Sequence, residues 1–166
     1  VYLDGYNGSI GDAAAFIKFY MPGEVNANSI ASAQLILRQY GAWNTGGFSA
    51  QIIKTTNFSE GNLTYYDNRP TEQGVYGNIW FNNVNHNGAS SFTNTWSSDI
   101  SQLIREGNQQ LNLKIMDSGA TSRSATFCSK DGNIAGHPCN QSWNGPLLQI
   151  YLKGSPTAPV NYGPNS

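Results

Sequence analysis

The sequence predicts an all-β protein, an antiparallel β-sandwich of jelly-roll type with one short helix. Apolar residues recur mostly at every second position, which is the period of a strand with one buried face. β-Branched and aromatic residues fill these stretches, and Gly, Asn, Asp and Pro separate them. Many short strands with a single helical interruption are typical of sandwiches and jelly rolls.

Eight stretches have this alternation, and a Gly-rich break is expected at residues 41–47, after the second of them. The predicted strands are residues 16–20, 33–40, 49–55, 76–84, 91–96, 111–116, 124–128 and 147–152.

The helix is predicted over residues 99–106. Asp99 is a good N-capping residue, and Gln102 follows it at the spacing of a capping box. Ile100, Leu103 and Ile104 then share one face, and Gly107 ends the helix.

The domain organisation is a single sandwich over residues 1–153, followed by residues 154–166 as a linker or extended arm. The tail, GSPTAPVNYGPNS, has three prolines and no apolar periodicity.

Composition excludes several classes of protein. Only 11% of the 166 residues are charged, and 9 Lys and Arg against 10 Asp and Glu leave no basic surplus for nucleic acid. No apolar run approaches the roughly 18 residues of a membrane span, and the 12% aromatic content is too high for a disordered chain.

Two cysteines, Cys128 and Cys139, bracket a loop that contains Gly132, Gly136 and Pro138. We expect them to form a disulfide, which points to an oxidising compartment. Two unrelated buried thiols are the alternative, and a metal site is disfavoured because His137 is the one nearby histidine.

Secretion, or exposure on an extracellular surface, is also favoured by four Asn-x-Ser/Thr sequons, which are candidate N-glycosylation sites: Asn7, Asn57, Asn62 and Asn140. An Asn-rich chain also produces sequons by chance. The chain opens without a charged-then-apolar signal segment, so we expect a mature form or an excised piece.

The segment NFSEGNLTYYDNRP, residues 57–70, resembles the W-S-E-x-x-(V/L)-T-W-N-N-x-P signature of the disaggregatase-related (DNRLRE) family. Alginate-binding carbohydrate modules are grouped with that family. The stretches before and after it resemble the family's opening strands and its closing helix and strands. The resemblance implies a secreted jelly roll that binds glycans or builds cell-surface proteins. The signature positions are occupied by Phe58, Ser59, Glu60, Leu63, Thr64, Tyr65, Asn68 and Pro70.

Catalytic motifs are scarce, so we expect no enzyme and no cofactor. Both histidines, His86 and His137, lie in polar loops, and no metal-protease, nucleophile-elbow or phosphate-loop motif is present. A polysaccharide lyase or hydrolase stays an alternative, because its two catalytic carboxylates come together in the fold and need no fixed spacing in the sequence. For Glu24, Glu60, Glu72 and Glu106, a solvated surface role is favoured.

Asp4 and Asp12 lie in the Gly-rich segment DGYNGSIGD and are candidate calcium ligands, together with Asn7. Ordinary turn chemistry, in which Asp and Asn bond their own backbone, is the favoured alternative.

Strand alternation predicts a polysaccharide-binding sheet face. Cations, amides and tyrosines alternate with buried residues, and such groups bind sugar hydroxyls, apolar sugar faces and uronate or sulfate groups. Lys18, Arg38 and Lys114 side by side would favour an anionic polymer; a plain solvated face, with Arg38 as a structural cation, is the alternative. The predicted ligand-binding residues are Lys18, Tyr20, Arg38, Tyr40, Asn112, Lys114, Gln149 and Tyr151.

A second candidate group consists of four tryptophans assigned to loops, at least two of which we expect in the core: Trp43, Trp80, Trp96 and Trp143. The leading functional hypothesis is a non-catalytic carbohydrate-binding module attached to a larger parent protein. The alternative is a structural subunit or adhesion domain that assembles with copies of itself. An ordered tail docked on a neighbouring molecule would favour this alternative.

Overall fold

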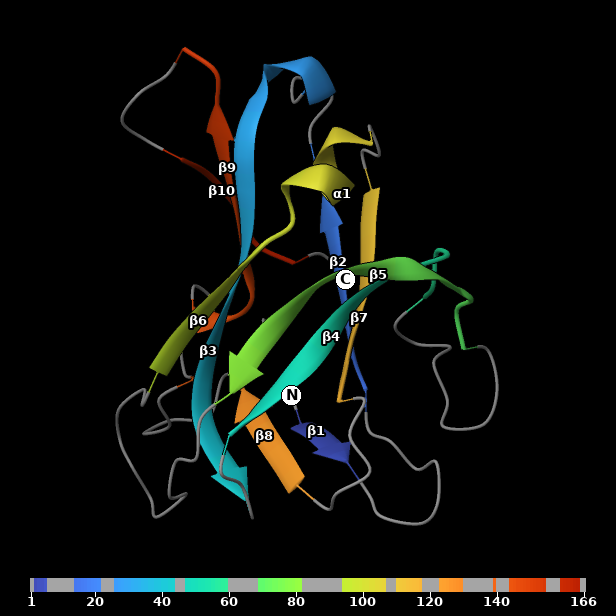
Figure 1. The fold of residues 1–166 in the computed structure, drawn as a ribbon, viewed down its shortest axis with the longest axis vertical. Helices are drawn as coiled ribbons and strands as arrows, with labels where there is room; N and C mark the ends of the chain where they lie inside the picture. The colour runs from blue at the N-terminus through green and yellow to red at the C-terminus, as the bar shows by residue number, and fades with distance from the viewer. Residues whose placement is uncertain are drawn as a thin grey trace.

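The computed structural model describes residues 2–5, 14–21, 26–43, 47–59, 69–81, 94–106, 110–117, 123–129, 139, 144–154 and 159–164. Two antiparallel sheets pack face to face, as the sequence predicts (Figure 1). Sheet A contains β1 (Tyr2–Gly5), β8 (Arg123–Phe127), β3 (Ile30–Trp43), β6 (Asn94–Asp99), β9 (Leu147–Leu152) and β10 (Val160–Tyr162). Sheet B contains β2 (Ala15–Tyr20), β7 (Gln110–Asp117), β4 (Phe48–Thr55) and β5 (Glu72–Phe81).

The first eight strands pair as one long hairpin that has been rolled up. β4 pairs with β5, β3 with β6, β2 with β7 and β1 with β8, all antiparallel. Rolling this hairpin gives the sheet orders β1-β8-β3-β6 and β2-β7-β4-β5, which is a jelly roll. β9 and β10 then extend sheet A along the edge of β3 that β8 also uses.

The core lies between the inner faces of the two sheets. The residues predicted to point inward are buried, including Ile17, Leu35 and Leu113, except that Leu152 is only partly buried. Phe81 of sheet B stacks on Phe127 of sheet A with ring centroids 6.1 Å apart, so the two sheets are joined by aromatic packing.

Where the predicted strands fall on described residues, the structure has strands there and differs at several ends; residues 82–84 and 91–93 of the prediction lie outside the described part. The predicted break after residue 40 is wrong, because β3 continues through Gly41 to Trp43. A register shift between Gln39 and Gly41 lets the strand continue alongside β8. β5 begins at Glu72, earlier than predicted, and β6 extends to Asp99.

The sequence pattern missed two short strands, β1 and β10. Within the predicted linker or arm, Val160–Tyr162 pairs with β9 of the same chain, and Tyr162 packs against the core. This tail segment therefore docks on its own chain, and its position gives no support for docking on a neighbouring molecule.

The predicted disulfide is present, with Cys128 bonded to Cys139. Cys128 directly follows β8, and its backbone N–H donates to the carbonyl of Arg38 in β3 (3.0 Å). The bond therefore closes a loop between β8 and β9, two strands that lie one after the other along β3.

Helix α1 (Ser101–Arg105) lies at the upper end of the sandwich in Figure 1 and is shorter than predicted. Asp99 Oδ1 accepts from the backbone N–H of Ser101 (2.8 Å), so it caps the helix start from one residue before the N-cap position. The Ser101 hydroxyl accepts from Ala33 N–H (2.8 Å), and Arg105 donates to the Ala31 carbonyl. These bonds attach α1 to β3.

None of the helices in the described part of the chain is long and apolar enough to cross a membrane.

Hydrogen bonds from the Ser101 hydroxyl and N–H lower the pKa of Asp99 below its ordinary value of 3.8. The charged carboxylate therefore stabilises the fold above about pH 4, and this contribution is lost as the pH falls through the lowered pKa. We expect Asp99→Asn, which keeps an acceptor oxygen, to lower the melting temperature at neutral pH. The difference from wild type should shrink between about pH 4 and about pH 2, measured by calorimetry. A difference that stays constant with pH would contradict this role.

Candidate functional site

The eight residues predicted to share one binding face lie on two different faces. Lys18, Tyr20, Asn112 and Lys114 belong to β2 and β7 of sheet B. Arg38, Tyr40, Gln149 and Tyr151 belong to β3 and β9 of sheet A, with the Tyr40 side chain outside the described part. The rolled hairpin places β2 and β3 in different sheets, so their outward residues lie on opposite sides of the sandwich.

Two of the residues expected to be exposed, Lys18 and Asn112, are buried, each with 8% of its surface accessible. Residues 56–59 follow β4 and cover this end of sheet B. Lys18 Nζ donates to the Phe58 carbonyl and lies 4.8 Å from the centre of the Phe58 ring. Asn112 Oδ1 accepts from Gln110 Nε2 (2.9 Å). Both side chains lie on the outer face of the sheet, as alternation predicts, but Phe58 covers Lys18 and Gln110 bonds to Asn112.

The expected cluster of three cations does not form. Lys114 pairs with Glu72 on the same outer face (2.6 Å). Arg38, on the other sheet, donates to the carbonyl of Gly145 just before β9 (3.3 Å). Each cation has a partner within the chain, so the argument for an acidic polymer that neutralises them is lost.

The outer face of sheet A has a row of polar residues across four strands. Register places Asn161 of β10 beside Gln149 of β9, Gln149 beside Gln34 of β3, and Gln34 beside Asp99 of β6. Tyr151 lies in the next row on β9, beside Ser32. These residues form a polar surface that is half-buried to exposed, with neighbouring residues of the row about 4.8 Å apart.

An exposed tryptophan dominates the other end of the sheet B outer face. Trp80 of β5 is 48% exposed, whereas its neighbours Ile79 and Phe81 are fully buried. Trp80 therefore points outward from the sheet. Its indole lies against Gly47, where a Cβ atom would come within 2.5 Å of Trp80 Cζ2. Gly47 has φ +90°, a left-handed conformation that favours glycine. The indole thus has backbone support and solvent contact.

Uncharged polar residues surround this indole. Ser49 of β4 is directly opposite Trp80, and Gln51 is opposite Asn78 of β5. Neighbouring strands are about 4.8 Å apart and alternate residues about 7 Å apart, so the group has the dimensions of one to two sugar rings. We call Trp80, Asn78, Gln51 and Ser49 the Trp80 patch.

The sequence contained the signal for the position of Trp80 but not for its support. Ile79 and Phe81 alternate with Trp80, and this alternation predicts an outward indole. The expectation that Trp80 belongs to a loop is wrong, because it lies in β5. Trp96 is half-buried and donates from Nε1 to Gln39 Oε1 (2.7 Å). Trp143 and the Trp43 side chain lie outside the described residues.

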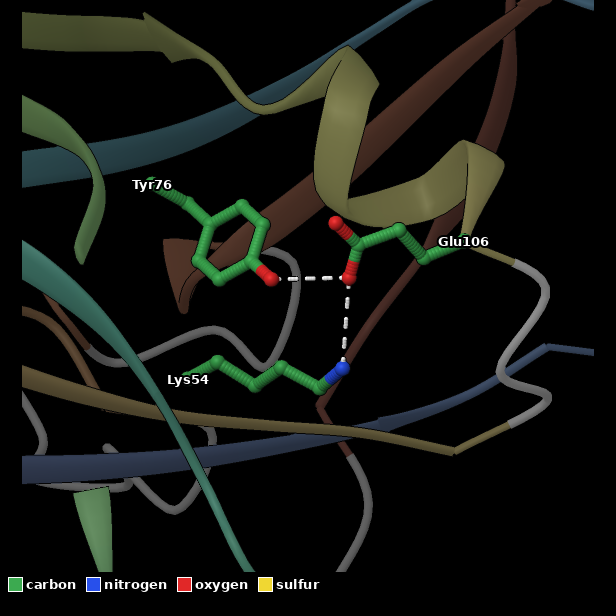
Figure 2. A network of polar contacts seen from close by, with 3 residues as sticks. All are labelled: Lys54, Tyr76 and Glu106. Atoms are coloured by element: carbon green, nitrogen blue, oxygen red, sulfur yellow. Dashed lines mark hydrogen bonds and ion pairs between the residues drawn. The ribbon is translucent and has the colours of Figure 1, made fainter. Parts of the chain in front are cut away.

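A second polar group joins α1 to sheet B. Figure 2 shows Lys54 of β4 and Tyr76 of β5 converging on one carboxylate oxygen of Glu106, the residue after α1. Glu106 Oε2 accepts from the Tyr76 hydroxyl at 2.8 Å and from Lys54 Nζ at 3.3 Å. The bond to Glu106, then burial and the charge of Glu106, raise the pKa of Tyr76 above its ordinary value of 10.0. The Tyr76 hydroxyl is the donor in this bond, and we call Lys54, Tyr76 and Glu106 the clasp, because they join α1 to sheet B.

The remaining predicted residues fall largely outside the described part: Asn7, Asn62, Asn140, Asp12, His86, His137, Glu24 and Glu60. The backbone of Asp4 lies in β1, but its side chain is outside the described part. Among the described side chains, no three of His, Cys, Asp and Glu are grouped to hold a metal. Asn57 is described and exposed.

No family model matches the chain, and no curated protein matches it significantly. The resemblance to the disaggregatase-related family therefore stays a prediction, and residues 60–68 of its signature lie outside the described part.

Replacing Lys18 tests whether it holds residues 56–59 on sheet B. Lys18→Met keeps an unbranched apolar stem but leaves the Phe58 carbonyl without this donor, at a cost of about 1–3 kcal/mol. The matched control is Lys114→Met, which breaks an ion pair whose Glu72 side chain is 51% exposed, a pair worth about 1 kcal/mol or less. Urea denaturation measures both, and equal small losses would show that Lys18 does not anchor the segment.

The clasp predicts an alkaline transition. Because the folded pKa of Tyr76 is raised, its contribution to stability is present below about pH 10 and is lost as the pH rises through the raised value. We expect Tyr76→Phe to lower the melting temperature near neutral pH and to show a smaller further fall above about pH 10. Parallel wild-type and variant curves in that range would contradict the clasp.

Proposed function

We propose that the chain is a non-catalytic carbohydrate-binding domain of an extracellular protein, and that it binds a polysaccharide at the Trp80 patch. The observation that carries the proposal is the indole of Trp80, open to solvent on one side and backed by Gly47. An indole held in this way presents a flat apolar face beside a polar N–H edge. Pyranose rings have apolar C–H faces that pack on such a surface.

The chemistry around the indole supports a sugar ligand. The amides of Asn78 and Gln51 and the hydroxyl of Ser49 both donate and accept, as sugar hydroxyls do. These groups have no charge, which favours a neutral glycan over the acidic polymer expected from the lysines.

The disulfide supports an oxidising compartment, and hence secretion or an extracellular surface. The clasp and the ion pair of Glu72 give two of the candidate catalytic carboxylates structural roles, which favours binding without catalysis.

The alternative is a structural subunit of an extracellular assembly. The tail strand β10 pairs with its own chain, so it supplies no argument for a neighbour. Sedimentation over a range of concentrations distinguishes the two functions, because a subunit that assembles gains mass with concentration.

A glycan array followed by titration calorimetry tests the binding proposal. Trp80→Ala should weaken the neutral glycan at least tenfold, or about 1.4 kcal/mol, and Trp80→Phe should weaken it less. The matched control is Val75→Ala on the same strand, because Val75 is equally exposed, at 53%, without a stacking surface. Binding should change little with salt, since the patch is uncharged. An array without ligands, or equal affinities for Trp80→Ala and Val75→Ala, would reject the proposal.

A further inference from the structure

Residues 56–59, which lie over the other end of sheet B, alternate between half-buried and exposed residues. Phe58 faces the sheet, where its ring meets the edge of Phe16 with centroids 5.5 Å apart. Asn57 and Ser59 on either side of it are exposed. The backbone is held as well, because Thr56 N–H donates to the Thr71 carbonyl (2.9 Å). The anchored phenylalanine therefore presents both of its neighbours to solvent.

The amide of Asn57 has a defined orientation. Gln110 Nε2 donates to Asn57 Oδ1 at 2.6 Å and to Asn112 Oδ1 at 2.9 Å. The two N–H groups of Gln110 thus meet two carbonyl oxygens, which assigns the oxygen of Asn57 to the side facing the sheet. Its amide nitrogen Nδ2 is then on the other side, away from Gln110.

Asn57, Phe58 and Ser59 form an Asn-x-Ser sequon in which Asn57 and Ser59 are exposed in the folded chain. We propose that Asn57 is an N-linked glycosylation site. The sugar donor is an oligosaccharide diphosphate: Nδ2 forms a bond to the anomeric carbon and gives up one proton. The bond from that carbon to the diphosphate oxygen breaks, and the diphosphate leaves with the electron pair.

The fold leaves room for this modification without blocking the Trp80 patch. Ser49, beside Trp80, and Asn57 are eight residues apart along β4 and its extension, roughly 25 Å at strand spacing. The glycan would lie over the end of sheet B where Lys18 and Asn112 are already covered. The disulfide places the chain in a compartment compatible with such a transfer.

The test uses the protein secreted from cultured eukaryotic cells. Cleavage after glutamate releases residues 25–60, which contain Asn57 as their single sequon and are separated from Asn62. We expect this fragment to have the added mass of an oligosaccharide, and peptide N-glycosidase should remove the mass and leave aspartate at position 57. Secreted protein with an intact disulfide and an unmodified fragment would overturn the proposal.

Variants separate the sequon from effects on folding. Asn57→Gln and Ser59→Ala should both abolish the added mass, whereas Ser59→Thr, which keeps the hydroxyl, should retain it. Loss of the modification in Ser59→Thr would contradict recognition of the sequon. Glycan binding by Asn57→Gln should equal that of wild type, so failure of this proposal and failure of the Trp80 patch give different results.

Discussion

The antiparallel pairing of β1 with β8, β2 with β7, β3 with β6 and β4 with β5 is the constraint on which the rest of the structure depends. Once this long hairpin is rolled, the strands along each of its arms alternate between the two sheets, and their inward residues meet in one core. The same step separates outward residues that are close in sequence. Lys18 and Arg38 therefore lie on opposite sides of the molecule, although each obeys the alternation of its own strand.

The short helix α1, between β6 and β7, joins the two sheets at one end of the sandwich because it bonds to both. Ser101 and Arg105 bond to β3 of sheet A, and Glu106 bonds to β4 and β5 of sheet B. Its apolar residues Leu103 and Ile104 are buried in the common core. A five-residue helix has little stability of its own, so these tertiary contacts are what maintain it.

The outer face of sheet B is divided into two ends with different chemistry. At one end, residues 56–59 cover Lys18 and supply its partner, the Phe58 carbonyl. At the other end, Trp80 stands on Gly47 with uncharged polar neighbours. The covered end explains why a lysine on a strand need not signal a binding face. At the Trp80 end, the described residues leave an apolar surface exposed to solvent.

The sequence by itself determined the strand alternation, the all-β class, the helix near Asp99 and the pairing of Cys128 with Cys139, because these depend on local periodicity, capping and loop closure. Position-by-position burial of the inner faces followed from the same alternation. Only the tertiary structure decided which outward residues share a face, since that depends on which strands pair. It also decided that Lys18 is covered and that Gly47 supports Trp80, because both contacts join segments far apart in the chain. Such contacts leave no periodic trace in the sequence, and the physical reason is that packing between distant segments depends on the shape of the folded chain.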